Sequence, residues 1–152
     1  MKKLEVMPRF NLQLFAEGES TDGGFLSNNK LTTSLYRKLL AEAVGKTGTI
    51  SKITKMAFGD QGETDEQGNP ALPSLDGDLN NVVLTVELDS VEYTADNVVC
   101  FNATVAKGAT TAQINEVALI TENDETAAKM RLLTSKCVDA ETQLTFAWSI
   151  EF

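Results

Sequence analysis

Apolar and polar residues alternate most strictly near the C-terminal end of the chain, over residues 144–152. In an extended strand, every second side chain points to the same face of the sheet. One face of this segment is therefore heavily apolar, which predicts a strand buried in the domain core or between subunits. The apolar positions are Leu144, Phe146, Trp148, Ile150 and Phe152.

Runs of β-branched and aromatic residues, each bounded by turn-forming residues, predict further strands. These runs lie at residues 50–58, 82–88, 98–105, 115–121 and 129–134. Asn123 and Asp124 predict a hairpin turn between the last two runs. Residues 59–78 carry no apolar periodicity and predict a long loop, a feature that is usually functional, oligomeric or flexible.

Residues 31–45 form the one segment with clear helical periodicity. Its apolar positions are Leu35, Leu39, Leu40, Ala43 and Val44. Thr32 or Thr33 can cap the start of the helix, and Gly45 can end it. A single apolar stripe predicts packing against a sheet. The expected fold class is α+β and mostly β: an antiparallel β-sandwich-like domain over residues 31–152, with one packed helix and an extended N-terminal arm.

Residues 1–30 are predicted to form this N-terminal arm and a linker. Apolar residues alternate with Asn11 and Gln13, and a polar Gly/Ser/Asp segment that predicts a flexible tether follows at residues 19–24. Such a strand can add to a partner, and the alternative is an edge strand that folds back across the domain's own sheet. The predicted partner-binding residues of the arm are Phe10, Leu12, Leu14 and Phe15.

The size and charge of the chain narrow the classes of function. Its 152 residues with 42% hydrophobic content suit one domain, or one domain with an arm. The 13 basic and 22 acidic residues give a net charge of −9. This balance disfavours binding to nucleic acid or to an anionic membrane surface, because both need clustered Lys and Arg. No apolar run approaches the roughly 20 residues that span a bilayer.

No motif for catalysis or for a cofactor is present in the sequence. The chain has no histidine, which removes the usual general base and the commonest metal ligand. Residues 59–62, Gly-Asp-Gln-Gly, lack the spacing of a phosphate-binding loop and the Lys-Ser/Thr that follows it. We therefore expect a non-enzymatic protein with no catalytic residue, cofactor or metal ligand.

The acidic side chains of the predicted loop raise the question of calcium, because carboxylate oxygens are its preferred ligands. They are Asp60, Glu63, Asp65, Glu66, Asp76 and Asp78. Their spacing does not match an EF-hand, so a solvated acidic loop is the favoured interpretation. A calcium- or sugar-binding module is kept as an alternative of another class.

The two cysteines, Cys100 and Cys137, lie in sequence contexts that are typical of buried strands. We interpret both as small buried core residues rather than as a disulfide or a reactive thiol. Reduced thiols fit a protein that is made and assembled in the cytoplasm.

Residues 11–16, Asn-Leu-Gln-Leu-Phe-Ala, resemble the start of many head proteins, including major capsid proteins, from phages of Gram-positive hosts. This resemblance implies a component of a phage particle.

A second resemblance covers residues 31–152. Residues 53–60, Ile-Thr-Lys-Met-Ala-Phe-Gly-Asp, are similar to the "I-T-x-M-A-x-G-D-G" motif in the N-terminal domain of phage tail-collar fibre proteins. The chain has Gln61 where that family usually has glycine. Residues 114–120 are similar to the family's later "I-x-E-V/L-x-L" strand, and residues 122–124 follow as a short hairpin.

Together these features predict a bacteriophage virion structural protein, assembled in the host cytoplasm. The favoured role is a capsid decoration protein or the base of a head fibre, which docks on the major capsid protein through its arm. Lattice symmetry favours a homo-oligomer, a trimer or a dimer. The alternative is a tail fibre/collar or baseplate attachment protein. The arm and the missing fibre shaft after Phe152 count against this alternative.

Overall fold

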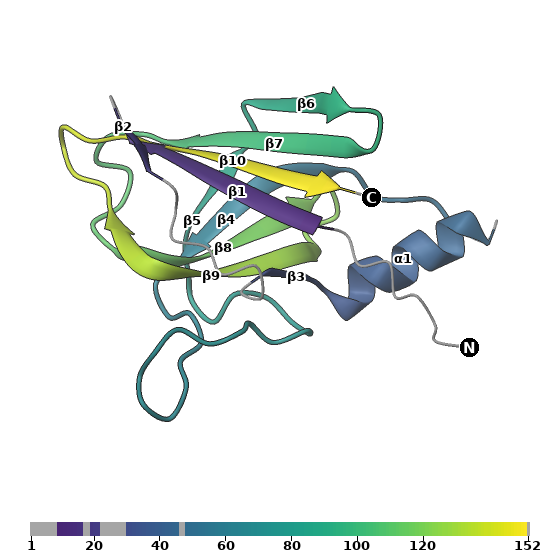
Figure 1. Cartoon of the computed structure of the whole chain (residues 1–152), viewed down its shortest axis with the longest axis horizontal. Helices are drawn as coiled ribbons and strands as arrows, with labels where there is room; N and C mark the ends of the chain where they lie inside the picture. Colours follow the sequence, from purple (N-terminus) through teal and green to yellow (C-terminus); the bar gives the residue numbers. More distant parts are fainter. Residues whose placement is uncertain (1–8, 17–18, 22–29, 46–47, 152) are drawn as a thin grey trace.

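The computed structural model of the protein describes residues 9–16, 19–21, 30–45 and 48–151. Two five-stranded antiparallel sheets pack on each other, and one helix lies at one end of this sandwich (Figure 1). The mostly β, sandwich-like α+β fold with a single helix that the sequence predicts is therefore confirmed.

The first sheet has the strand order β2-β1-β10-β7-β6, and the second has the order β3-β9-β8-β4-β5. The strands of the first sheet are β1 (Arg9–Ala16), β2 (Glu19–Thr21), β6 (Ser90–Ala95), β7 (Val98–Val105) and β10 (Leu144–Glu151). Those of the second are β3 (Lys30–Thr32), β4 (Ile53–Gly59), β5 (Val82–Glu87), β8 (Gln113–Thr121) and β9 (Thr126–Cys137).

The core lies between the two sheets, and β10 supplies a large part of it. Burial alternates along β10 as its sequence pattern predicts, with Phe146 and Trp148 fully buried. Phe58 of β4 meets Phe146 across the core, with ring centroids 4.7 Å apart and the ring planes tilted by 47°. This aromatic contact joins the two sheets and adds to the hydrophobic burial that stabilises them.

The helix α1 (Ser34–Val44) forms where the sequence predicts it. The Thr33 hydroxyl accepts a hydrogen bond from the Tyr36 N–H at the start, and the Gly45 N–H donates to the Ala41 carbonyl at the end. These contacts satisfy backbone groups that a helix leaves unpaired at its ends.

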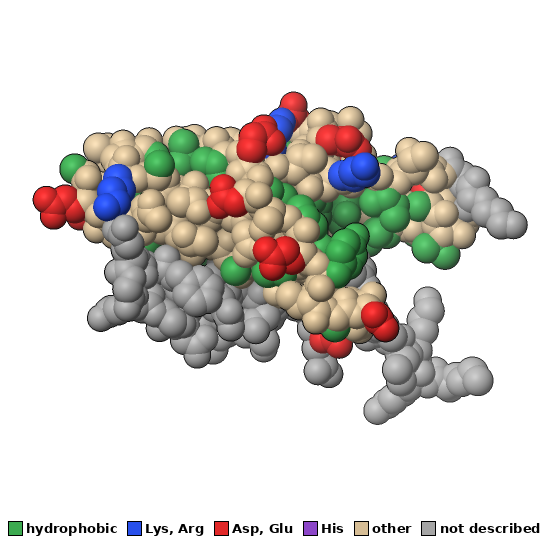
Figure 2. Space-filling model, turned by 90° about the horizontal axis from the view of Figure 1, so that it is seen from above, with side chains coloured by type: hydrophobic (Ala, Val, Ile, Leu, Met, Phe, Trp, Pro, Cys, Tyr) green, Lys and Arg blue, Asp and Glu red, His purple; other side chains and the backbone are tan. Residues whose placement is uncertain are grey.

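The apolar stripe of α1 packs less completely than the sequence predicts. Tyr36 is the one buried residue of the helix, while Val44 remains 84% exposed. The helix lies at the end of the sandwich rather than across a sheet face (Figure 1). Tyr36 belongs to the core, and Leu39 and Leu40 pack against it only partly buried. Apolar side chains reach the surface at this end of the molecule (Figure 2).

Three strands of the structure were not predicted from the sequence. β2 and β3 have three residues each, too few to show any periodicity. β6 is largely exposed and carries alternating apolar and polar residues, but only Val91 and Tyr93 of these are large and apolar. Because β6 is an edge strand, its pattern gives a weaker signal than the fully buried strands do.

The two cysteines differ in environment. Cys100, on β7, is buried as predicted. The prediction of a buried Cys137 is wrong, because this residue ends β9 and is exposed. Burial along β9 fades after Leu132, where the strand runs past the core. Both thiols are free.

Candidate functional site

The predicted docking segment lies on the protein's own first sheet. β1 pairs antiparallel with β10 over its whole length, from Arg9 opposite Glu151 to Ala16 opposite Leu144, without a register shift. The sequence leaves two alternatives open for this segment: it adds to a partner, or it folds back as a strand of the domain's own sheet. The structure has the second arrangement. Phe10 lies opposite Ile150, Leu12 opposite Trp148, Leu14 opposite Phe146, and Phe15 opposite Thr145.

This register divides the four predicted docking positions between two faces. Paired positions of an antiparallel ladder lie on the same face of the sheet. Positions 10, 12 and 14 therefore share the face of Phe146, Trp148 and Ile150, which belong to the core. Position 15 falls on the opposite face, with Thr145. In this arrangement the four positions do not form one continuous surface.

A second feature was not predicted: buried charged side chains beneath the loop of residues 60–81, which joins β4 to β5. Glu116 of β8 is 5% exposed, and Lys129 and Arg131 of β9 are 3% and 7% exposed. A buried charge is costly unless hydrogen bonds replace its hydration. The hydrogen-bond partners of these three side chains therefore show which parts of the structure they hold in place.

Glu116 holds the end of the 60–81 loop. Its carboxylate accepts hydrogen bonds from the backbone N–H groups of Asn80 (3.3 Å) and Asn81 (3.2 Å). Gly59, opposite Glu116 in the β4–β8 ladder, makes room for this carboxylate. A Cβ atom at position 59 would lie 2.6 Å from the Glu116 Cγ and 2.6 Å from the Asn81 carbonyl oxygen. Only glycine fits without a shift of these atoms.

Arg131 holds the beginning of the same loop. Its Nε donates to the Glu63 carbonyl (2.9 Å), and its Nη1 donates to the carbonyls of Asn115 (2.8 Å) and Leu132 (2.9 Å). A Cβ atom at position 62 would lie 2.7 Å from the Arg131 Nε, so Gly62 permits this close approach.

Lys129 binds the loop through backbone carbonyls. Its Nζ donates to Asp76 (2.9 Å) and to Asp78 (3.4 Å). Burial lowers the pKa of Lys129, and the surrounding carboxylates, of which Glu116 is the strongest, partly oppose that shift. Burial likewise lowers the pKa of Arg131, with Glu116 again opposing it. The negative charge of Glu116 thus favours the protonated form of both Lys129 and Arg131.

The two segments that resemble tail-collar proteins meet at this place. Besides the pairing of Gly59 with Glu116, the Asn115 side chain donates to the Asp60 carbonyl (2.9 Å) and accepts from the Gly62 N–H (2.8 Å). Segments that lie more than fifty positions apart in the chain therefore form one hydrogen-bonded unit. Gly59 and Glu116 are matched positions of the two motifs, Asn115 holds a variable position of the second motif, and Gly62 follows the first. We call these five residues, Gly59, Asp60, Gly62, Asn115 and Glu116, the motif junction.

Several carboxylates of the 60–81 loop bond to neighbouring side chains. Asp60 accepts from the Asn81 amide (2.7 Å), and Asp78 accepts from the Thr126 hydroxyl (2.6 Å). Within the described residues, no group of three or more His, Cys, Asp or Glu side chains is arranged to hold a metal ion.

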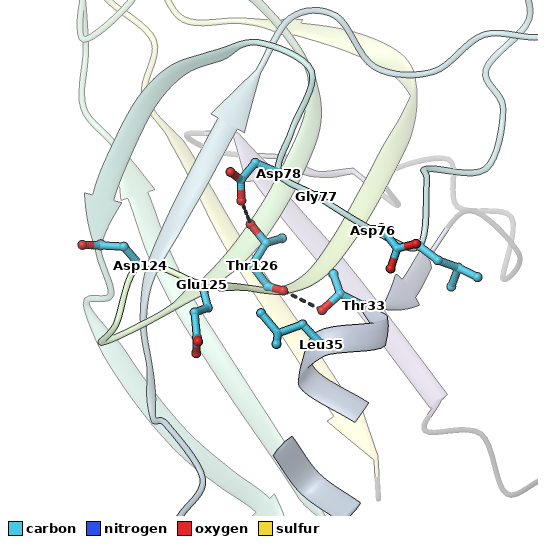
Figure 3. A pocket seen from close by; sticks show the side chains of 9 residues that line it. Thr33, Leu35, Asp76, Gly77, Asp78, Asp124, Glu125 and Thr126 are labelled. Carbon is cyan, nitrogen blue, oxygen red and sulfur yellow. Dashed lines mark hydrogen bonds between the residues drawn. The ribbon is translucent and has the colours of Figure 1, made fainter. Parts of the chain in front are cut away.

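A pocket of about 260 Å³ lies beside the start of α1 (Figure 3). Its walls come from Thr33 and Leu35, from residues 75–78 and from residues 124–126. The walls carry four carboxylates, but Asp78 bonds Thr126, and Asp124 pairs with Lys55 at 2.6 Å. The Thr33 hydroxyl donates to the Thr126 carbonyl (2.6 Å), which ties α1 to the β8–β9 turn (Figure 3).

The hydrogen bonds of Asp65, at the tip of the 60–81 loop, can be tested by changing the pH. Asp65 accepts from the backbone N–H groups of Asn69 (2.8 Å) and Gln67 (2.9 Å), and these hydrogen bonds lower its pKa. A lowered pKa means that the bonds contribute fully above the ordinary aspartate pKa and fade as the pH falls through the lowered value. We expect the protection of the Gln67 and Asn69 amides, measured as the intrinsic exchange rate at each pH divided by the observed rate, to fall over that acidic range. Asp65→Asn, which keeps an acceptor oxygen but does not titrate, should lose this acid-dependent step; an unchanged step would contradict the assignment.

The chain matches no protein-family model, no curated protein and no solved structure in comparisons with known proteins. Among the described residues, no helix is both long and apolar enough to cross a membrane.

Proposed function

We propose that this chain is a non-enzymatic bacteriophage virion structural protein, a capsid decoration protein or the base of a head fibre. The motif junction is the observation that carries the proposal. The segments that carry the two separated motifs lie in a single hydrogen-bonded unit, and the matched motif positions Gly59 and Glu116 pair across the β4–β8 ladder, as expected if both motifs belong to one folded domain. The likeness of residues 11–16 to the start of phage head proteins favours the head over the tail.

The proposed partner is the major capsid protein, bound through the segment that contains Phe10, Leu12, Leu14 and Phe15. β2 covers β1 only at residues 14–16, so the outer edge of residues 9–13 has no partner among the described strands. Unpaired backbone at a sheet edge is a template for strand addition. Many copies on one particle, each a trimer or a dimer, would add modest affinities through avidity.

A tail fibre/collar or baseplate attachment protein is the second candidate. The motif junction favours it, because the motifs themselves resemble tail-collar fibre proteins rather than head proteins. The two candidates share the fold and differ in the number of copies on the particle.

Copy number in purified particles tests the proposal. We expect quantitative mass spectrometry to find this chain in a ratio near one to one with the major capsid protein, or at one trimer per repeated lattice position. A ratio of a few per cent would move the protein to the tail or a vertex. Absence from the particle would overturn the virion role, and a rise in melting temperature with calcium or a sugar would then favour a binding module.

A further inference from the structure

We infer that β1 is an exchangeable strand, and that the β10 edge of one copy also accepts β1 of a second copy of this chain. The inference concerns how copies associate, and it does not depend on whether the protein belongs to a virion.

The β10 edge needs an occupant. β10 has β7 on one side and β1 on the other, and its inward residues Phe146 and Trp148 are fully buried. Without β1, backbone N–H and C=O groups along this strand would lose their partners at an open edge beside the core. A β10 edge without a neighbouring strand is therefore an unstable arrangement.

The strand that fills this edge has few other ties to the domain. Among the described strands, β1 has β10 and β2 as sheet neighbours, and the three-residue β2 pairs with β1 alone. Within this described part of the sheet, one ladder joins the β1–β2 hairpin to the other strands. Residues 22–29 join this hairpin to β3 along the chain.

A second copy is the occupant that fits best. The β1–β10 ladder runs over eight pairs without a bulge, so β1 of any copy can form the same pairs in the same register. Every copy supplies one β1 and needs one, so an exchange between copies leaves no edge open. The β1–β10 contacts are the same whether β1 pairs within its own chain or with a second copy. The ratio of the two forms therefore depends on the connection between β1 and its own domain and on the protein concentration. Strands joined to their own domain by short connections compete with strands of other copies at an effective concentration of about millimolar, so exchange should become measurable when copies are concentrated to that range.

Disulfide trapping across the β1–β10 ladder tests the inference. Gln13 pairs with Ala147, so Gln13→Cys and Ala147→Cys, each in a Cys137→Ser background, place thiols on different molecules. The two full-length variants are unfolded together, refolded at about millimolar concentration and oxidised mildly. We expect a covalent dimer that joins positions 13 and 147, identified by mass spectrometry of the disulfide-linked peptides. The Gln13→Cys/Ala147→Cys double variant, oxidised in dilute solution, should instead form the bond within one chain.

An off-register pair provides the control. Thr145 lies two positions from Ala147 and pairs with Phe15, so Gln13→Cys mixed with Thr145→Cys reports random collisions. Exchange predicts about tenfold more dimer from the 13–147 mixture than from the 13–145 mixture, because a disulfide needs close and well-directed Cβ atoms. Equal yields from the two mixtures overturn the inference. Failure of the double variant to close its internal disulfide overturns it too, because the ladder itself would then be wrong.

Discussion

Deletion of residues 1–16 is expected to unfold the isolated domain. The deletion removes β1, which pairs with β10 along all eight of its residues, and it leaves β2 without the one neighbour that it has among the described strands. The edge of β10 then opens beside the buried Phe146 and Trp148. Small domains are stable by only about 5–15 kcal/mol, so the loss of a complete internal strand should consume most of that margin. Urea unfolding followed by the fluorescence of Trp148, the single tryptophan, measures the effect.

A pair of point substitutions on β1 serves as the matched control. Leu12 lies opposite Trp148 on the core face, and Gln13 lies opposite Ala147 on the other face. Leu12→Asp should cost about 3 kcal/mol of unfolding free energy, because it places a charge at a core-facing position. Gln13→Asp should cost less than about 1 kcal/mol. A deletion variant as stable as the full chain would mean that β1 is not part of the folded sandwich, and would restore the picture of a free docking arm.

The arm illustrates where inference from the sequence ends. Alternation of Phe10, Leu12 and Leu14 predicts an extended segment with one apolar face, and this segment is a strand. The same alternation suits a strand that docks on a partner and a strand that docks on its own domain. Only the three-dimensional position of the β10 edge distinguishes these cases, and that position depends on contacts more than a hundred residues away in sequence.

The strands and the helix were predictable because their signals are local. Strict alternation over β10, and the Thr33 and Gly45 caps of α1, each lie within one element. The buried charges are different. Glu116 and Arg131 lie within otherwise apolar runs, and their burial arises from a loop that folds back over the sheet. Gly59 and Gly62 were the sequence signal for this arrangement. Glycine is needed at these two positions because side chains on β8 and β9 approach the backbone closely there, which the sequence does not show.

Gly59→Ala is expected to be the most damaging single substitution at the motif junction. The added methyl group meets the Glu116 side chain on one side and the Asn81 carbonyl oxygen, at 2.6 Å, on the other. The Glu116 side chain can rotate away only by giving up its hydrogen bonds to the Asn80 and Asn81 N–H groups. Overpacking of this kind costs about 3 kcal/mol of unfolding free energy, measured by urea denaturation. The loop should also detach, seen as faster amide exchange at Asn80 and Asn81.

Gly68→Ala separates this steric effect from the general cost of replacing glycine. No atom lies within 4 Å of a Cβ atom at position 68, and only the positive φ of 83° opposes the change, so its cost should be about 1 kcal/mol. In the double variant Gly59→Ala/Glu116→Ala, the clash with the side chain disappears while that with the Asn81 carbonyl remains. Its destabilisation should therefore fall short of the sum of the two single changes by about 1 kcal/mol or more. If Gly59→Ala proves no worse than Gly68→Ala, Glu116 and the 60–81 loop move aside freely. The motif junction is then not the rigid unit on which the proposed function relies.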